Sequence, residues 1–190
     1  MALDKSTTAL LVVDAIDSVA EGDDTVYDNE LSPEMAAFRA NVARVVDLAH
    51  EAGLPVIFSN DAHVPGLDHE LELWGEHGIV GRTRIFPEVT VADTDLIVTK
   101  RRYSGFFGTD LDLTLRELGV DTLVVVGCDT NICVAHTLAD AYYRNYETVV
   151  VEPATITFLG VGTQEGAIDT FRKCYASTIV GVEELAGMLA

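Results

Sequence analysis

Short runs of apolar residues alternate along this chain with longer segments that repeat at helical spacing. The apolar runs predict six strands, the last of them short, at residues 8–13, 55–59, 95–99, 122–126, 148–151 and 178–180. Helical patterns are found at residues 33–52, 110–118, 134–146, 164–175 and from 182 onward. Strands that alternate with helices form right-handed βαβ units. The pattern therefore predicts an α/β fold, a three-layer α/β/α sandwich with a doubly wound, mostly parallel sheet of five or six strands.

The helix predicted at residues 33–52 has the clearest boundaries. Ser32 is a favourable N-cap, Pro33 fits the first turn, and Glu34 complements the positive end of the helix dipole. Gly53 predicts the end of the helix. No linker rich in proline, glycine or serine divides the chain, and 190 residues are enough for one core. We therefore expect residues 1–190 to form a single domain.

Polar groups stand at the ends of four predicted strands. They are Asp14, the pair Asn60 and Asp61, Lys100, and the segment 128–133. A charged group at the end of a buried strand gains nothing unless it is paired or used. Ligands of open parallel sheets bind beyond the carboxyl ends of the strands. The sequence therefore predicts a site at this edge, with an acid, a candidate metal cluster, a lysine and a thiol.

Residues 127–134, Gly-Cys-Asp-Thr-Asn-Ile-Cys-Val, join an apolar strand to a predicted helix. Asp129, Thr130 and Asn131 occupy capping positions, and a cysteine in the first turn of a helix lies where the dipole favours a thiolate. The local sequence is equally compatible with a structural cysteine. His136, three residues after Cys133, competes as its base, but a packing role is favoured because spacing alone does not supply the geometry.

The other two cysteines are interpreted differently from Cys133. Cys128 and Cys174 have no partner pattern around them and are predicted to be buried thiols. An odd number of cysteines at unrelated spacings indicates reduced thiols and not a disulfide framework.

The charge balance excludes several classes of partner. The chain has 31 acidic and 12 basic residues, a net charge of −19, so we expect no binding to nucleic acid or to anionic membranes. No apolar run approaches the roughly 20 residues of a membrane span, and we expect no signal peptide, because the segment of residues 1–8 is short and polar. We expect a cytoplasmic protein. The dispersed acids favour the hypothesis of a halophilic cytoplasm, where salt screens the repulsion among them.

The segment from residue 61 to residue 88 has weak periodicity but concentrates candidate ligands. Asp61, His63, His69 and His77 supply carboxylate and imidazole groups beside Trp74, the only tryptophan. Such a loop often carries function, although loop histidines also occur without any metal.

The sequence resembles the isochorismatase-like superfamily of cysteine hydrolases, which includes nicotinamidases, N-carbamoylsarcosine amidases and isochorismatases. The resemblance rests on motifs in the same order over nearly the whole chain, at residues 11–14, 99–100, 103–109, 127–134 and 139–141. It implies a catalytic triad of Asp14, Lys100 and Cys133, in which Lys100 lowers the pKa of Cys133 and Asp14 accepts the thiol proton. It also implies a cis peptide at Cys128-Asp129, and an oxyanion hole formed by the backbone N–H groups of Asp129 and Cys133.

The nicotinamidase branch of the superfamily carries a divalent metal on an Asp-x-His motif and a later histidine. Asp61, His63 and His77 match those ligands, so the resemblance implies Zn²⁺ or another divalent cation and no organic cofactor. Trp74 and Tyr103 are expected to contact the substrate. The implied reaction is hydrolysis of a small non-peptide amide through a thioester, with nicotinamide as the first candidate. Family members often form homo-oligomers, and we expect the same here.

Two segments depart from the nicotinamidase pattern. Residues 14–19 lack its glutamine and place Val19 where an aromatic residue would stand, and residues 81–84, Gly-Arg-Thr-Arg, replace a smaller turn. The alternatives are therefore another amidase acting on carbamoyl or ureido compounds, an isochorismatase-type ether hydrolase, or a catalytically silent binding domain. Arg101 and Arg102 are either a clamp for a substrate carboxylate or, as we favour, partners of acidic side chains.

Overall fold

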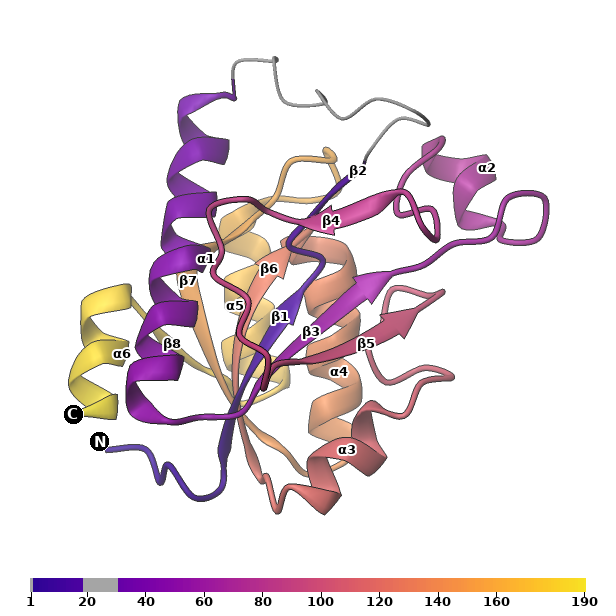
Figure 1. The fold of residues 1–190 in the computed structure, drawn as a ribbon. Helices are drawn as coiled ribbons and strands as arrows, with labels where there is room; N and C mark the ends of the chain where they lie inside the picture. The colour runs from indigo at the N-terminus through magenta and orange to yellow at the C-terminus, as the bar shows by residue number, and fades with distance from the viewer. Residues whose placement is uncertain (1, 19–30) are drawn as a thin grey trace.

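A parallel six-stranded sheet, in the order β5-β3-β1-β6-β7-β8, forms the centre of the fold, with helices on both faces (Figure 1). The computed structural model describes residues 2–18 and 31–190. The strands are β1 (Thr8–Val13), β3 (Val56–Asp61), β5 (Leu96–Lys100), β6 (Thr122–Cys128), β7 (Glu147–Ile156) and β8 (Thr178–Val180). All neighbouring pairs run parallel. The predicted three-layer sandwich is confirmed, and the sheet has the sixth strand.

Two hydrophobic clusters fill the layers on either side of the sheet. α1 (Pro33–Ala52) and α6 (Val182–Leu189) pack on one face. The other face is covered by α3 (Leu111–Glu117), α4 (Ala135–Tyr143) and α5 (Gln164–Cys174). All six residues of β1 are buried, and successive residues point alternately into the two clusters. Burial on both faces explains why this strand is apolar without interruption.

Three short elements lie in segments where the sequence predicted loops. β2 (Ile16–Ser18) and β4 (Thr83–Ile85) form a separate antiparallel ribbon. α2 (Glu70–Trp74) lies between β3 and β4 in the chain and contributes residues to the wall of a cavity. Elements of three to five residues are too short to give a recognisable period. The ribbon places Ile16 and Asp17 beside the end of β1.

The segment after β6 begins differently from the prediction. A five-residue π-helix, η1 (Thr130–Val134), comes first and leads directly into α4, which ends at Tyr143 instead of residue 146. Cys133 therefore belongs to a π-helical turn. Cys128 is buried as expected, but Cys174 is exposed at the end of α5, so the prediction of a buried thiol there is wrong.

Gly127 allows the backbones of β1 and β6 to approach each other closely. It has a φ of 122°, and a Cβ atom placed on it would lie 1.9 Å from the carbonyl oxygen of Val13. Only glycine fits this position without displacing β1. The close contact lies one residue before both Asp14 and Cys128.

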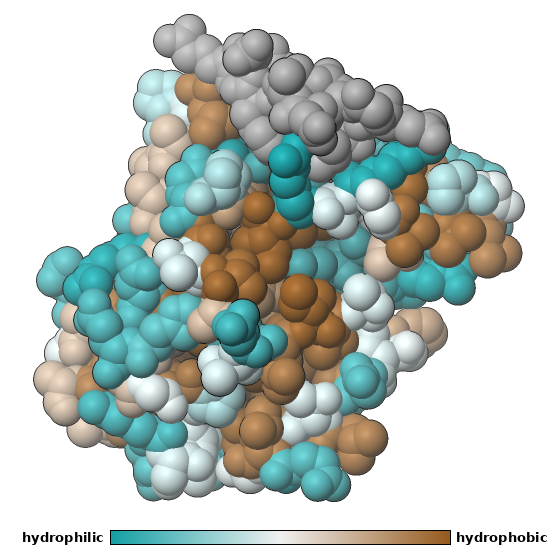
Figure 2. Space-filling model, in the orientation of Figure 1, coloured by the Kyte–Doolittle hydropathy of each residue, from teal (hydrophilic) through white to brown (hydrophobic). Residues whose placement is uncertain are grey.

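Apolar side chains are exposed to solvent at the β5 edge of the sheet. Leu96 and Ile97 on this strand are 38% and 58% exposed. On the face seen in Figure 1, Figure 2 shows hydrophobic residues in the centre and hydrophilic residues over much of the left-hand side. The homo-oligomer expected from the resemblance stays a prediction.

Within the described ranges, no helix combines the length and the apolar composition that crossing a membrane requires.

Candidate active site

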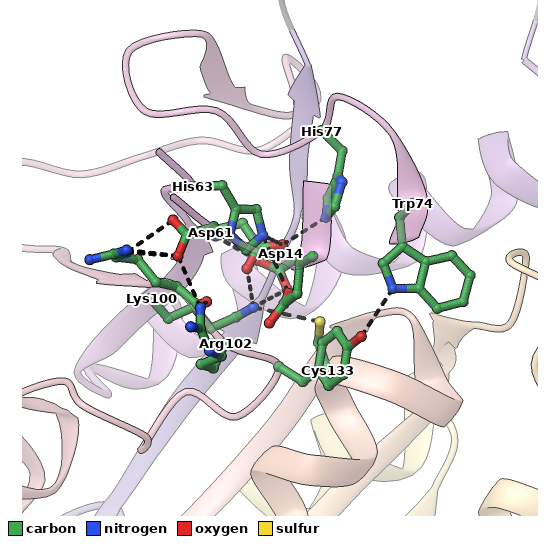
Figure 3. Close-up of polar contacts among 12 residues, drawn as sticks. Asp14, Asp61, His63, Trp74, His77, Lys100, Arg102 and Cys133 are labelled. Atoms are coloured by element: carbon green, nitrogen blue, oxygen red, sulfur yellow. Dashed lines mark hydrogen bonds and ion pairs between the residues drawn. The ribbon is translucent and has the colours of Figure 1, made fainter. Parts of the chain in front are cut away.

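The four strand ends singled out in the sequence meet at one place. β5, β3, β1 and β6 are consecutive neighbours in the sheet, so Lys100, Asp61 and Asp14 converge at its carboxyl edge, and Cys133 joins them from η1 (Figure 3). The sequence prediction of a shared edge is confirmed.

Lys100 lies at the centre of this group. Its Nζ is 2.7 Å from Asp14 Oδ2 and 3.5 Å from Cys133 Sγ, and it also forms an ion pair with Asp61 Oδ1 (Figure 3). The side chain is fully buried. Burial by itself would lower the pKa of Lys100, but Asp14, Cys133 and Asp61 raise it well above its usual value. Lys100 is therefore a permanent ammonium that neutralises buried carboxylates.

Asp14 is held by two contacts. Its Oδ1 accepts a hydrogen bond of 2.8 Å from the backbone N–H of Asp61, and its Oδ2 faces Lys100. Burial, followed by the charge of Asp61, raises the pKa of Asp14 to about 6, although Lys100 acts in the opposite direction. The group is ionised at neutral pH but is more basic than an ordinary aspartate, which suits a general base.

Cys133 is a thiol at rest. Burial raises its pKa well above the usual value, Asp14 raises it further, and the opposing effect of Lys100 is smaller. The predicted effect of Lys100, a lowering of the Cys133 pKa, is confirmed in direction, but burial of the thiol, which the sequence does not reveal, outweighs it. The thiol must lose its proton during nucleophilic attack, and Asp14 lies beside it.

Asp129 uses its carboxylate as a cap. Its Oδ1 accepts a hydrogen bond of 2.8 Å from the backbone N–H of Asn131. Its Oδ2 accepts hydrogen bonds of 2.9 and 3.0 Å from the backbone N–H groups of Phe158 and Leu159. The peptide bond between Cys128 and Asp129 is cis, as the resemblance implies. The roles of the Asp129 and Cys133 backbone N–H groups in an oxyanion hole stay predictions.

The imidazole ring of His136 forms a hydrogen bond with the backbone. Its Nδ1 donates to the carbonyl of Ile132 at 2.7 Å, and its ring packs 5.3 Å from that of Tyr103. This agrees with the packing role favoured from the sequence.

Asp61, His63 and His77 form a cluster that fits a metal ion. One ligand atom from each lies within 4.8 Å of the others, and Figure 3 shows the two histidines facing Asp61. His63 is fully buried, yet neither ring nitrogen has a hydrogen-bond partner among the described residues. Buried polar atoms are normally satisfied, and Nε2 of His63 lies 3.4 Å from Asp61 Oδ2. The donor set and the unpartnered nitrogens therefore fit a divalent cation, and the binding of one stays a prediction.

Glu70 is a fourth group of this cluster that the sequence reasoning missed. Its buried Oε2 lies 3.4 Å from His63 Nε2 and also lacks a hydrogen-bond partner in the described part of the chain. It comes from the first turn of α2, an element too short to predict. His69, the weaker candidate, is 82% exposed and pairs with Glu72 instead.

Arg101 and Arg102 are paired with an acid. Arg101 donates to the carboxylate of Asp68 through Nε and Nη2, and Arg102 donates through Nη1 at 3.0 Å. These hydrogen bonds hold the pKa of Asp68 well below its usual range. The favoured interpretation of the two arginines is therefore confirmed, and the alternative of a carboxylate clamp is not supported.

A cavity of about 370 Å³ opens above the thiol. Trp74 and Tyr103 line it, and the Nε1–H of Trp74 donates to the Tyr103 hydroxyl at 3.0 Å. Phe86 and Phe158 add aromatic surface. Val19, whose side chain departs from the nicotinamidase pattern, lies outside the described residues, and residues 81–84 are not among the described residues that line the cavity.

Comparisons with known proteins agree on the fold and the family. The isochorismatase domain family matches residues 8–182. An N-carbamoylsarcosine amidase from Thermoplasma acidophilum is 35% identical over 93% of this chain and 97% of its own, with a TM-score of 0.79. A nicotinamidase from Bacillus subtilis is 26% identical over 92% and 99%, with a TM-score of 0.77. A ureidoacrylate amidohydrolase from Variovorax paradoxus is 31% identical over 88% of this chain and 76% of its own.

Proposed function

Because this chain belongs to the isochorismatase family of hydrolases, we propose that it is a cysteine-dependent amidohydrolase that cleaves the carbon–nitrogen bond of a small, non-peptide amide. The observation that carries the proposal is the contact of Lys100 with both Asp14 and Cys133 at the base of the cavity. Hydrolysis of nicotinamide to nicotinate and ammonia is our first candidate reaction. An amide of this size fits a cavity of about 370 Å³.

The mechanism follows from the resting charges of the three side chains. Asp14 accepts the proton of the Cys133 thiol as the sulfur attacks the amide carbon and a C–S bond forms. Lys100 keeps its charge and stabilises the carboxylate and the developing thiolate. The negative oxygen of the tetrahedral intermediate is assigned to the backbone N–H groups of Asp129 and Cys133. Asp14 then returns the proton to the leaving nitrogen, and ammonia departs.

The second half of the cycle uses the same groups. Water attacks the thioester, Asp14 removes a proton from that water, and Asp14 returns the proton to the sulfur as the C–S bond breaks to give the acid product and the free thiol of Cys133. Asp14 therefore acts twice as a base and twice as an acid, and a carboxyl pKa of about 6 suits both roles near neutral pH.

A divalent cation would be held by Asp61, His63, His77 and Glu70. Such an ion supplies Lewis-acid polarisation or a bound water of lowered pKa. Asp61 also contacts Lys100, so the cluster and the triad share a residue.

A ureido or carbamoyl amide is the second candidate substrate. It is favoured by the 35% identity to the N-carbamoylsarcosine amidase, which exceeds the 26% identity to the nicotinamidase from Bacillus subtilis, and by the similarity to the ureidoacrylate amidohydrolase. Ammonia release, measured with nicotinamide, pyrazinamide and a set of carbamoyl and ureido compounds at low and molar potassium chloride, tests both candidates. Failure to release ammonia from any compound under either condition contradicts the proposed function.

The activity should have an acid limb near pH 6. Asp14 must be ionised to accept the thiol proton, and its pKa is raised to about 6. We therefore expect kcat/KM to fall about tenfold for each pH unit below this value and to level off above it. An ordinary aspartate would place the limb near pH 4. A profile that stays flat between pH 7 and pH 4.5 would show that Asp14 is not the base.

Wild-type protein should bind one divalent metal per chain at the cluster. After chelator dialysis, added Zn²⁺ should be retained in elemental analysis and should raise Tm, because the ion binds only the folded chain. His77→Ala should weaken the affinity for Zn²⁺ by more than about 100-fold, because loss of a direct ligand should reduce metal affinity more than loss of an outer-shell partner does. His69→Ala is the matched control and should behave as wild type, since His69 is exposed. No retention and no Tm shift in wild type would contradict the metal site.

A further inference from the structure

Arg39 places a buried positive charge in the wall of the cavity. It comes from α1, whereas Lys100 comes from β5. The residue is 6% exposed, and its guanidinium lies 4.2 Å from the ring centroid of Phe86. Both terminal nitrogens donate to the carboxylate of Asp17, the Nη1 bond at 3.2 Å. Nη1 also lies 3.7 Å from Glu88, which is 39% exposed. The guanidinium is therefore engaged by carboxylates of the protein itself.

Carboxyl groups outnumber cationic groups among the described residues that line the cavity. Those among its described lining residues are Asp14, Asp17, Asp61, Glu70 and Asp129. Among the described residues, Arg39 in the wall and Lys100 beneath are positive groups that face them, and the charge of Arg84 also attracts Asp17. Arg84, opposite Asp17 in the β2–β4 ladder, is exposed at the outside. A divalent cation at the cluster would reduce the excess of negative charge without reversing it.

An anionic substrate meets two obstacles in such a site. Its carboxylate would lie among like charges, which costs affinity strongly where water is excluded. To reach Arg39 it would also have to displace Asp17, whose own charge would then be buried without its partner. A neutral amide meets neither obstacle.

We infer that the site selects amides that carry no negative charge, and that Asp17 is a specificity-determining residue because it occupies the guanidinium that a substrate carboxylate would need. The inference rests on the proposed amide hydrolysis and names the class of amide. It separates this chain from the ureidoacrylate amidohydrolase, whose substrate is by name an acid.

Pairs of substrates that differ in charge test the selection. Pyridine-3,5-dicarboxamide and 5-carbamoylpyridine-3-carboxylate have nearly the same shape, and methyl N-carbamoylglycinate and N-carbamoylglycine form a ureido pair. With ammonia release as the readout, wild type should prefer the neutral member of the pair it hydrolyses by about tenfold or more in kcat/KM, after correction for the two equal amides of the dicarboxamide.

Variants of the ion pair then test the role of Asp17. Asp17→Asn should raise kcat/KM for the anionic member by about tenfold, because Arg39 becomes available to its carboxylate. Glu88→Gln is the matched control and should change the preference less than about twofold, since Glu88 is more exposed and more distant. Asp17→Ser repeats the test if the asparagine variant loses its native circular dichroism.

Three results would count against the inference. Equal or faster hydrolysis of the anionic member by wild type overturns the charge selection and leaves the proposed function standing. An unchanged preference in the folded Asp17 variants overturns the role of Asp17. No ammonia from either pair, or from nicotinamide, overturns the proposed function and this inference with it.

Discussion

Cys133→Ala should abolish amide hydrolysis, with a loss in kcat of about 10⁴-fold or more. The sulfur is the atom that forms the covalent bond to the substrate. Because the nucleophile and its base act as a unit, removing the nucleophile leaves only the rate enhancement that comes from binding. Ammonia release from the best substrate of wild type measures the effect. The variant should fold, because replacing the thiol by hydrogen at this buried position removes one heavy atom from a small side chain.

Cys174→Ala is the matched control for this experiment. Its thiol is exposed at the end of α5, so the variant should keep wild-type activity and Tm. Substantial turnover by Cys133→Ala, in protein whose Tm and circular dichroism match wild type, would rule out the thioester mechanism. Turnover is a sharper test than alkylation of the thiol, because burial raises the pKa of Cys133 and slows its reaction with any reagent.

Lys100→Met should both inactivate and destabilise the protein. The substitution leaves Asp14 and Asp61 as two buried carboxylates without their ammonium. Breaking a buried pair in this way costs about 3–5 kcal/mol. We expect the free energy of unfolding at pH 7, measured in urea after chelator treatment, to fall by about that amount. Lys173→Met removes an exposed lysine paired with Asp169 and should cost less than about 1 kcal/mol.

The stability deficit of Lys100→Met should shrink as the pH falls. The pKa of Asp14 is already raised to about 6 with Lys100 present, and Lys100 acts to lower it, so removing the lysine raises it further. A carboxyl group with a raised pKa in the folded state destabilises that state above its folded pKa and ceases to do so below its unfolded pKa. The difference from wild type should therefore narrow between pH 7 and pH 4. A deficit independent of pH would mean that the carboxylates do not cause it.

The sequence predicted the sheet well because its central strands, β1, β3 and β6, are buried on both faces. β1 has the predicted bounds, and β3 and β5 end within two residues of the predicted positions. The polar residue that follows each apolar run is informative because parallel strands all end at one edge. Asp14, Asp61, Lys100 and Cys133 could be assigned to one site on that basis.

The parts that the sequence did not predict depend on packing between distant segments. Glu70 lies in a helix of five residues, and Arg39 lies in a long helix where an arginine is usually on the surface. Neither position has a local signal for burial. The raised pKa of Cys133 has the same origin, because the effect of Lys100 could be predicted from the sequence but the desolvation that outweighs it could not.

The carboxylate of Asp129 has a mechanical consequence for the cavity. It accepts two hydrogen bonds from the backbone of Phe158 and Leu159 and a third from Asn131 within the turn that carries the nucleophile, so it couples that turn to the wall of the cavity formed by Phe158 and Leu159. On the other side of the cavity, the indole of Trp74 is held by a hydrogen bond to another side chain, that of Tyr103. We therefore expect a bulkier ligand to displace the indole before it displaces the wall at Phe158 and Leu159.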